Sequence, residues 1–189
     1  MMNSGTNFKV RTCLSASAYV AVVVPSSHST CARSLAMGHH ISGVVIPGEI
    51  DTHLALQFDA KIVSLRKGFN AIALCGEYVD TWAERLDMRD DVAAMPLFNS
   101  RVVRHIATAL AGDRPFAFVE TDYFGGNGTQ WGAAYRGDAE LAPLAEGGAG
   151  PINAALKAIG VRSFLTDCFT AVGLAEHRDW DDLFEDYFD

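Results

Sequence analysis

The feature that most constrains the fold is a pair of strand-like runs joined by a glycine-rich tip. Residues 116–124 are dense in aromatic and β-branched side chains, and residues 129–136 return as a second run. The four residues Gly125-Gly126-Asn127-Gly128 between them tolerate the positive φ angles that a tight connection needs. The pattern predicts a β-hairpin, so we expect a mainly antiparallel sheet.

Further strands are predicted before this hairpin. The runs are short, partly β-branched and separated by turn residues. Arg66-Lys67-Gly68 separates two of them and predicts another hairpin. The expected strands cover residues 41–46, 53–58, 61–65 and 70–75.

Capping residues and apolar spacing predict the helices. Thr81-Trp82-Ala83-Glu84 matches a capping box and predicts a short helix near residues 81–88. Ser100 can cap a stronger helix that Gly112 ends, and Pro151 suits the first turn of a helix that ends before Gly160. Residues 137–149 are predicted to form an exposed loop.

The C-terminal residues predict one more amphipathic helix. Its apolar side chains recur at helical spacing, and aspartates and a glutamate occupy the opposite side. The apolar stripe consists of Trp180, Leu183, Phe184, Tyr187 and Phe188.

These elements predict one compact α+β domain over residues 37–189, with helices packed chiefly on one face of the sheet. A chain of 189 residues with 49% hydrophobic and 20% charged residues has the balance of a globular protein. Neither a linker nor an internal repeat interrupts residues 37–189.

Residues 1–36 are expected to stand apart from this domain as a non-core leader. They contain Lys9, Arg11 and Arg33 but no carboxylate, and their apolar stretch, residues 19–24, is far shorter than the ~20 residues of a membrane span. Our interpretation is that translation starts at Met37, so that residues 1–36 are upstream sequence without a fold of their own. The alternative is that they form a secretory signal. The corresponding expectations are a cytoplasmic protein or, with a functional signal, a secreted or periplasmic one.

Charge and cysteine content narrow the function classes. The formal net charge is −8, which argues against nucleic acid or an anionic membrane as the main partner. Cys75 and Cys168 lie in apolar surroundings, match no zinc or redox spacing, and are predicted to be small buried side chains in an intracellular domain.

Sequence motifs for catalysis are missing. The chain has no P-loop, dinucleotide fingerprint, nucleophile elbow or His-Glu-x-x-His motif, and its lysines are few. We therefore expect a protein without a cofactor and favour a non-enzyme. The histidines His39, His40 and His53, with Glu49 and Asp51, form the one cluster of metal-type ligands, and we interpret them as polar surface residues because adjacent strand residues point to opposite faces.

The candidate functional surface centres on the 116–136 hairpin. Glu120 and Asp122 are two residues apart in a strand, so both carboxylates project from one face and could hold a divalent cation or act as acid and base. The alternative is that they occupy the solvent end of a strand whose apolar part ends at Val119. Glycines and aromatic residues beside them could present amides and rings to a partner. The candidate surface comprises Glu120, Asp122, Tyr123, Phe124, Gly125, Gly126, Asn127, Gln130 and Trp131.

The segments 120–130 and 150–156 resemble small acidic bacterial proteins of unknown function and, in general character, the immunity proteins of bacterial toxin systems. The resemblance implies a bacterial protein that works by binding another protein, and it transfers no functional residue. Our leading hypothesis is a non-catalytic binding module whose acidic surface suits a basic protein partner. The alternatives are a small metal-dependent hydrolase that uses Glu120 and Asp122, and a structural subunit that dimerises through the hairpin.

Overall fold

The computed structural model describes residues 38–88, 96–124 and 127–187, so the leader lies outside the described residues. The elements in chain order are β1 (Gly38–Pro47), α1 (Thr52–Gln57), β2 (Ile62–Ser64), the 3₁₀ turn η1 (Arg66–Gly68), β3 (Phe69–Ala73), α2 (Gly76–Arg85), η3 (Leu97–Asn99), α3 (Arg101–Ala111), β4 (Phe116–Phe124), β5 (Asn127–Arg136), β6 (Ala139–Gly147), α4 (Pro151–Ala158), α5 (Cys168–Val172), η4 (Leu174–Glu176) and η5 (Asp181–Tyr187).

The strands form one six-stranded sheet in the order β2-β3-β1-β4-β5-β6, and every neighbouring pair is antiparallel. The predicted hairpin is confirmed, because β4 and β5 pair from Phe116 with Tyr135 to Phe124 with Asn127. The hairpin at Arg66-Lys67-Gly68 is confirmed as well, since it joins the paired strands β2 and β3.

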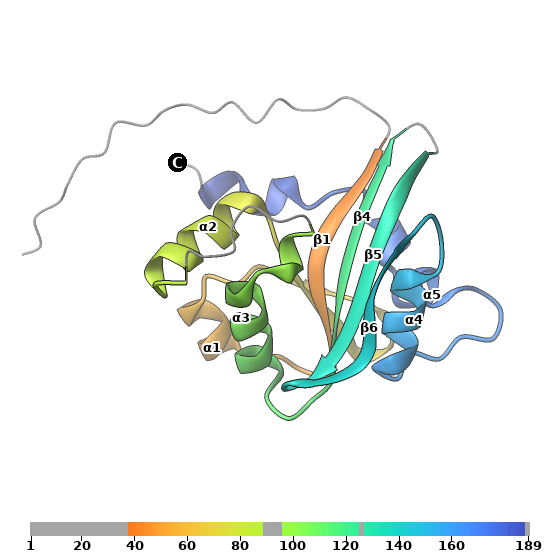
Figure 1. Ribbon diagram of the computed structural model, residues 1–189, viewed down its shortest axis with the longest axis horizontal. Coiled ribbons are helices and arrows are strands. Elements are labelled where there is room, and N and C mark those ends of the chain that lie inside the picture. Colours follow the sequence, from red (N-terminus) through yellow and green to blue (C-terminus); the bar gives the residue numbers. More distant parts are fainter. Residues whose placement is uncertain (1–37, 89–95, 125–126, 188–189) are drawn as a thin grey trace, which may run out of the picture. The chain divides into compact units, whose positions relative to one another are not determined.

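Helices lie on both faces of the sheet (Figure 1). The larger layer holds α1, α2 and α3, and its contact with the sheet includes the stacked rings of Phe98 and Phe118. The smaller layer holds α4 and α5, where a side chain at Gly132 of β5 would collide with the backbone of Pro151. The prediction of a single α+β domain with an antiparallel sheet is confirmed. Helices were expected chiefly on one face of the sheet, and the layer on the second face was not predicted.

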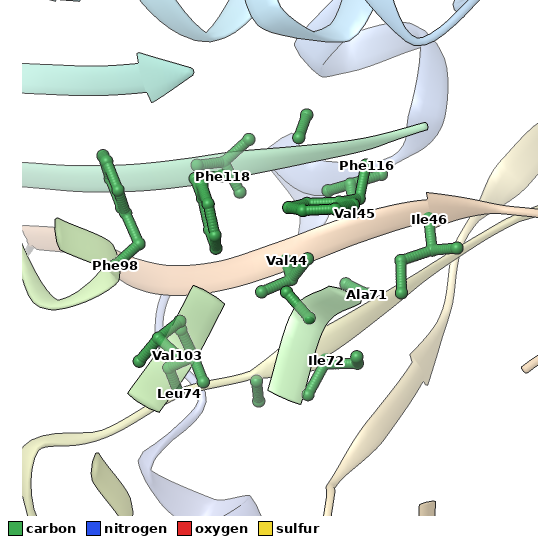
Figure 2. Close-up of a cluster of buried hydrophobic side chains, with 14 of the residues drawn as sticks. Val44, Val45, Ile46, Ala71, Ile72, Leu74, Phe98, Val103, Phe116 and Phe118 are labelled. Carbon is green, nitrogen blue, oxygen red and sulfur yellow. The ribbon is translucent and has the colours of Figure 1, made fainter. Parts of the chain in front are cut away.

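The main core lies between the sheet and the larger helical layer (Figure 2). β1 contributes six consecutive buried residues, 41–46, because both of its faces are covered by helices and both of its neighbours are strands. Figure 2 shows Phe98 beside Phe118, with Val103 of α3 near Leu74. A central strand that is buried on both faces has to be apolar at nearly every position.

The caps of α3 and α4 agree with their sequence signals. The Ser100 side chain accepts a hydrogen bond from the backbone N–H of Val102, and Gly112 ends α3 with φ of 59°, a conformation that favours glycine. Pro151 occupies the first turn of α4, where its missing N–H costs no helical hydrogen bond.

Residues 53–57 are helical and Phe58 is the C-cap of α1, so the strand predicted over residues 53–58 is wrong. Asp51 caps α1, because its side chain accepts hydrogen bonds from the N–H groups of His53 and Leu54. The helix is brief and buries Ala55 alone among its own residues, so its side chains show little helical periodicity.

The helix predicted near residues 81–88 starts earlier than expected. Thr81 lies in the middle of α2, and the N-cap position belongs to Cys75, which makes no side-chain capping bond. The capping-box interpretation is therefore wrong, although Trp82 is buried as the pattern required. The five residues before Thr81 continue the same buried face through Tyr78 and Val79.

The predicted loop at residues 137–149 is also wrong, because residues 139–147 form the edge strand β6. Most of β6 is exposed, its pairing with β5 is irregular near Ala134, and Pro143 lies within it. The two leucines of β6 are three residues apart among alanine, glutamate and proline, so the strand lacks the apolar alternation by which strands are recognised.

The C-terminal stripe is partly confirmed. Trp180 and Phe184 are buried, but residues 181–187 form the 3₁₀ helix η5 instead of an α-helix, and Phe188 lies outside the described residues.

Cys168 is buried and Cys75 is half-buried, and neither forms a disulfide with another described residue. None of the helices in the described ranges is long and apolar enough to cross a membrane.

Candidate functional site

Glu120 of β4 is fully buried, although its strand continues to exposed residues. Its carboxylate Oε2 accepts hydrogen bonds from the Ser42 hydroxyl at 2.9 Å and from the Leu97 N–H at 3.0 Å. Ser42 lies directly opposite Glu120 in the β1–β4 register, and Leu97 begins the turn η3. The other oxygen, Oε1, is buried and has no hydrogen-bond partner among the described residues.

Burial raises the pKa of Glu120 above its ordinary value of 4.5. Removal of the carboxylate from water is the largest effect, and the hydrogen bonds from Ser42 and Leu97 oppose it because they favour the charged form. The interpretation that both carboxylates occupy the solvent end of the strand is therefore wrong for Glu120. The buried part of β4 extends through Thr121, beyond Val119.

Asp122 lies two residues beyond Glu120 but in a different environment. Its side chain is exposed and lies 3.9 Å from Nδ1 of His40 on the neighbouring strand. Glu120 is meanwhile held by Ser42 and the backbone of η3. The two carboxylates share a face of the sheet but have separate partners.

The residues with metal-type side chains, which we interpreted as polar surface residues, do not gather into one site. His39 is half-buried, with its Nδ1 2.9 Å from the Thr121 hydroxyl and its ring 5.4 Å from that of Phe169, and burial lowers its pKa. His40 and His53 are exposed on different elements, and Asp51 caps α1. Within residues 38–88, 96–124 and 127–187, no three His, Cys, Asp or Glu side chains are placed to hold one metal ion.

The candidate hairpin surface divides into an exposed end and a packed base. Phe124 is 68% exposed, and Asp122 and Asn127 are exposed beside it. Tyr123, Gln130 and Trp131 are half-buried, and the Tyr123 hydroxyl donates to the Gly148 carbonyl. Gly125 and Gly126 lie outside the described residues. The structure thus brings Asp122, Phe124 and Asn127 together at the surface and withdraws Glu120 from it.

A group of carboxylates gathers at the end of the sheet where Asp122 and Phe124 lie. The sequence patterns did not predict this group as a site. The backbone N–H of His40 donates to the Arg178 carbonyl at 2.6 Å, which places the chain before η5 beside the start of β1. Asp181 lies close enough to His40 and Glu77 for their charges to alter its pKa. We call the exposed residues Glu77, Asp122, Asp179, Asp181 and Asp182 the acidic end.

The negative charges around Asp181 in the acidic end repel one another. Partial burial and the neighbouring charges of Asp179, Asp182 and Glu77 raise the pKa of Asp181, while His40 lowers it. Asp181 and Asp182 were predicted on the polar side of a helix, but the approach of Asp181 to Glu77 of α2 is a tertiary contact without a local signal.

Comparison with protein-family models, with curated proteins and with solved structures finds no match for this chain.

Proposed function

We propose that the protein is a non-catalytic binding module whose acidic end binds a basic protein partner. One observation carries the proposal: exposed carboxylates from three parts of the chain lie near one another at this end of the sheet. Asp122 lies 3.9 Å from His40, and Asp181 is close enough to His40 and to the other three carboxylates of the acidic end for their charges to alter its pKa. Concentrated charge of one sign speeds the encounter with an oppositely charged partner, and an exposed aromatic ring supplies apolar contact area.

The mutual repulsion within the acidic end supports the proposal. Like charges held close together cost folding free energy, and a cationic partner would neutralise them on binding. In this proposal the basic partner binds beside Asp181 and neutralises the repulsion between like charges that destabilises the free protein there. An immunity-like protein that blocks a basic toxin would have this character.

Glu120 supports binding over catalysis in this proposal. Its carboxylate is buried and satisfies Ser42 and the N–H of Leu97, which is the role of a group that fixes the turn η3 to the sheet. We also propose a cytoplasmic location, which suits two thiols, Cys75 and Cys168, that form no disulfide within the described part of the chain.

Photo-crosslinking in cells tests the proposal. A benzophenone amino acid replaces Phe124, and the captured protein is identified by mass spectrometry. The triple variant Glu77→Gln/Asp181→Asn/Asp182→Asn removes charge from the acidic end, and Asp138→Asn/Glu140→Gln/Glu146→Gln removes the same charge from exposed positions around β6. We expect one basic protein to be captured, and the capture to be lost in the first triple variant but retained in the second.

The salt dependence of the purified pair provides the quantitative arm. We expect the association rate to fall by about 10-fold or more in the first triple variant and to decrease with added salt in the parent protein. Equal effects of the two triple variants, or capture of a partner that is not basic, would overturn the proposal.

A further inference from the structure

Two adjacent apolar side chains outside the acidic end stand almost completely in solvent. Phe164 and Leu165 are each 98% exposed in the loop that joins α4 to α5. In Figure 1 this loop projects on the side of the sheet opposite α2. Single exposed apolar residues are common, but an exposed adjacent pair of this size marks a contact surface.

Hydrogen bonds within the loop and at the start of α5 support the loop. The Ser163 and Thr166 hydroxyls lie 3.1 Å apart, and Asp167 caps α5 by accepting from the Thr170 N–H at 2.7 Å. The N–H of Phe169 donates to the Asn153 side chain at 3.0 Å. Contacts of this kind reduce the conformational entropy that the loop backbone would lose on binding a partner.

A second segment, distant in sequence, braces the loop. The Lys67 ammonium donates to the Arg162 carbonyl at 2.7 Å across 95 residues of sequence. Lys67 does so from a left-handed backbone conformation, with φ of 60° and ψ of 27°, which residues other than glycine seldom adopt. A lysine at this costly position indicates that its side chain has a use there.

The two segments enclose a groove of about 380 Å³. Phe164, Leu165 and Ala171 supply apolar surface, and Arg66 and Lys67 supply positive charge at one side. The guanidinium of Arg66 pairs with Glu176, and Arg162 is exposed at the start of the loop. The groove thus combines an apolar wall with a cationic rim.

We propose that this groove binds an extended peptide segment of another protein, with a large apolar side chain against Phe164 and Leu165 and a carboxylate facing Arg66 and Lys67. The volume suits one or two side chains, and the charge of the rim selects an acidic segment. This site is distinct from the acidic end and takes a ligand of opposite charge, so it does not depend on the proposed function.

An anionic lipid surface is the competing occupant, and the charges disfavour it. Polybasic segments that bind such membranes carry about 4–8 lysines and arginines. Here the rim has Arg66, Lys67 and Arg162, with Glu176 and Asp167 close by, on a chain of net charge −8. An acidic peptide needs a single oriented contact with the rim, which these residues provide.

Selection from a phage-displayed library of random peptides against the full chain tests the proposal. We expect the enriched peptides to share an aromatic or large aliphatic residue next to Asp or Glu. The variant Phe164→Ser/Leu165→Ser should weaken a selected peptide by ~10-fold or more, which corresponds to about 1.4 kcal/mol. Leu141→Ser/Leu144→Ser changes two exposed leucines of β6 and should leave binding unchanged.

Charge variants and vesicles complete the test. Lys67→Asn keeps a residue that tolerates positive φ but removes the cation, and should weaken the peptide, whereas Lys157→Gln on α4 should not. Vesicles of phosphatidylserine and phosphatidylcholine should not retain the protein. Failure to enrich peptides, peptides that bind both serine double variants equally, or vesicle binding that depends on Phe164 and Leu165 would each overturn the proposal.

Discussion

The indole of Trp180 lies directly over Gly43, on the strand at the centre of the sheet. A Cβ atom built on Gly43 would come within 2.5 Å of Cζ3 of Trp180 and 2.6 Å of the Ile72 carbonyl oxygen. The glycine therefore provides the space that the ring occupies, and Trp180 is 4% exposed. This contact anchors the segment before η5 to the sheet.

The first prediction concerns the glycine. Gly43→Ala should destabilise the protein by about 1–3 kcal/mol, because the ring and the backbone of β3 would both have to move. Urea unfolding gives the free energy directly. Gly76→Ala, in the first turn of α2 where a Cβ would meet nothing within 4 Å, should be neutral or slightly stabilising and serves as the control. Equal effects of the two substitutions would contradict the contact.

Trp180→Ala should cost about 3–5 kcal/mol, the usual loss for a large buried aromatic side chain. The measurement is again the free energy of unfolding in urea. A cost below about 1 kcal/mol would mean that the ring is exposed in solution and that the C-terminal segment leaves the sheet. Phe124→Ala, which truncates an exposed ring, provides the comparison and should cost little.

Glu120 should make stability depend on pH with a definite sign. Burial raises its pKa in the folded protein, so the unfolded chain releases the proton first as the pH rises. The folded state therefore loses stability from about pH 4.5 upward until the buried carboxyl has ionised. Glu120→Gln lacks this loss, so its free energy of unfolding relative to the parent should increase over that range.

Urea unfolding of both proteins between about pH 4 and pH 8 measures this difference. Glu140→Gln, which removes an exposed carboxyl of β6, controls for the loss of one charge. Parallel curves for the parent and Glu120→Gln would show that the carboxyl is not buried in solution.

Arg114 should be among the costliest charged residues to remove. Its guanidinium donates to the carbonyls of Leu110 and Ala111 at 2.9 Å, and to those of Pro47 at 3.0 Å and Glu49. It thus satisfies the end of α3 and the turn after β1 together. Arg114→Ala should cost about 2 kcal/mol in thermal unfolding, whereas Arg136→Ala at the exposed end of β5 should change little. An equal loss at both positions would contradict this role.

Local signals predicted the elements whose own residues determine their structure. In α3, Ser100, the apolar spacing and Gly112 agree, and the helix forms as predicted. In α1 the available signal was Asp51, but a helix that buries one of its own residues shows no clear period. A capping residue alone, without apolar side chains at helical spacing, does not distinguish a short helix from a strand.

The candidate site was harder to predict because its properties come from tertiary contacts. The alternation of β4 placed Glu120 and Asp122 on one face, but η3, which covers Glu120, comes from more than 20 residues earlier in the chain. The same holds for Asp181 and Glu77, and for Lys67 and Arg162. Strand periodicity reports which face a side chain occupies and not what packs over that face.

The edges of the sheet have a consequence for how copies of this protein meet. Pro143 offers no N–H to an incoming strand, and the register of β6 against β5 is irregular near Ala134. At the opposite edge, β2 has three residues. Neither edge can template a continuous intermolecular sheet, so crowded solutions of this protein should resist fibril growth from its native state.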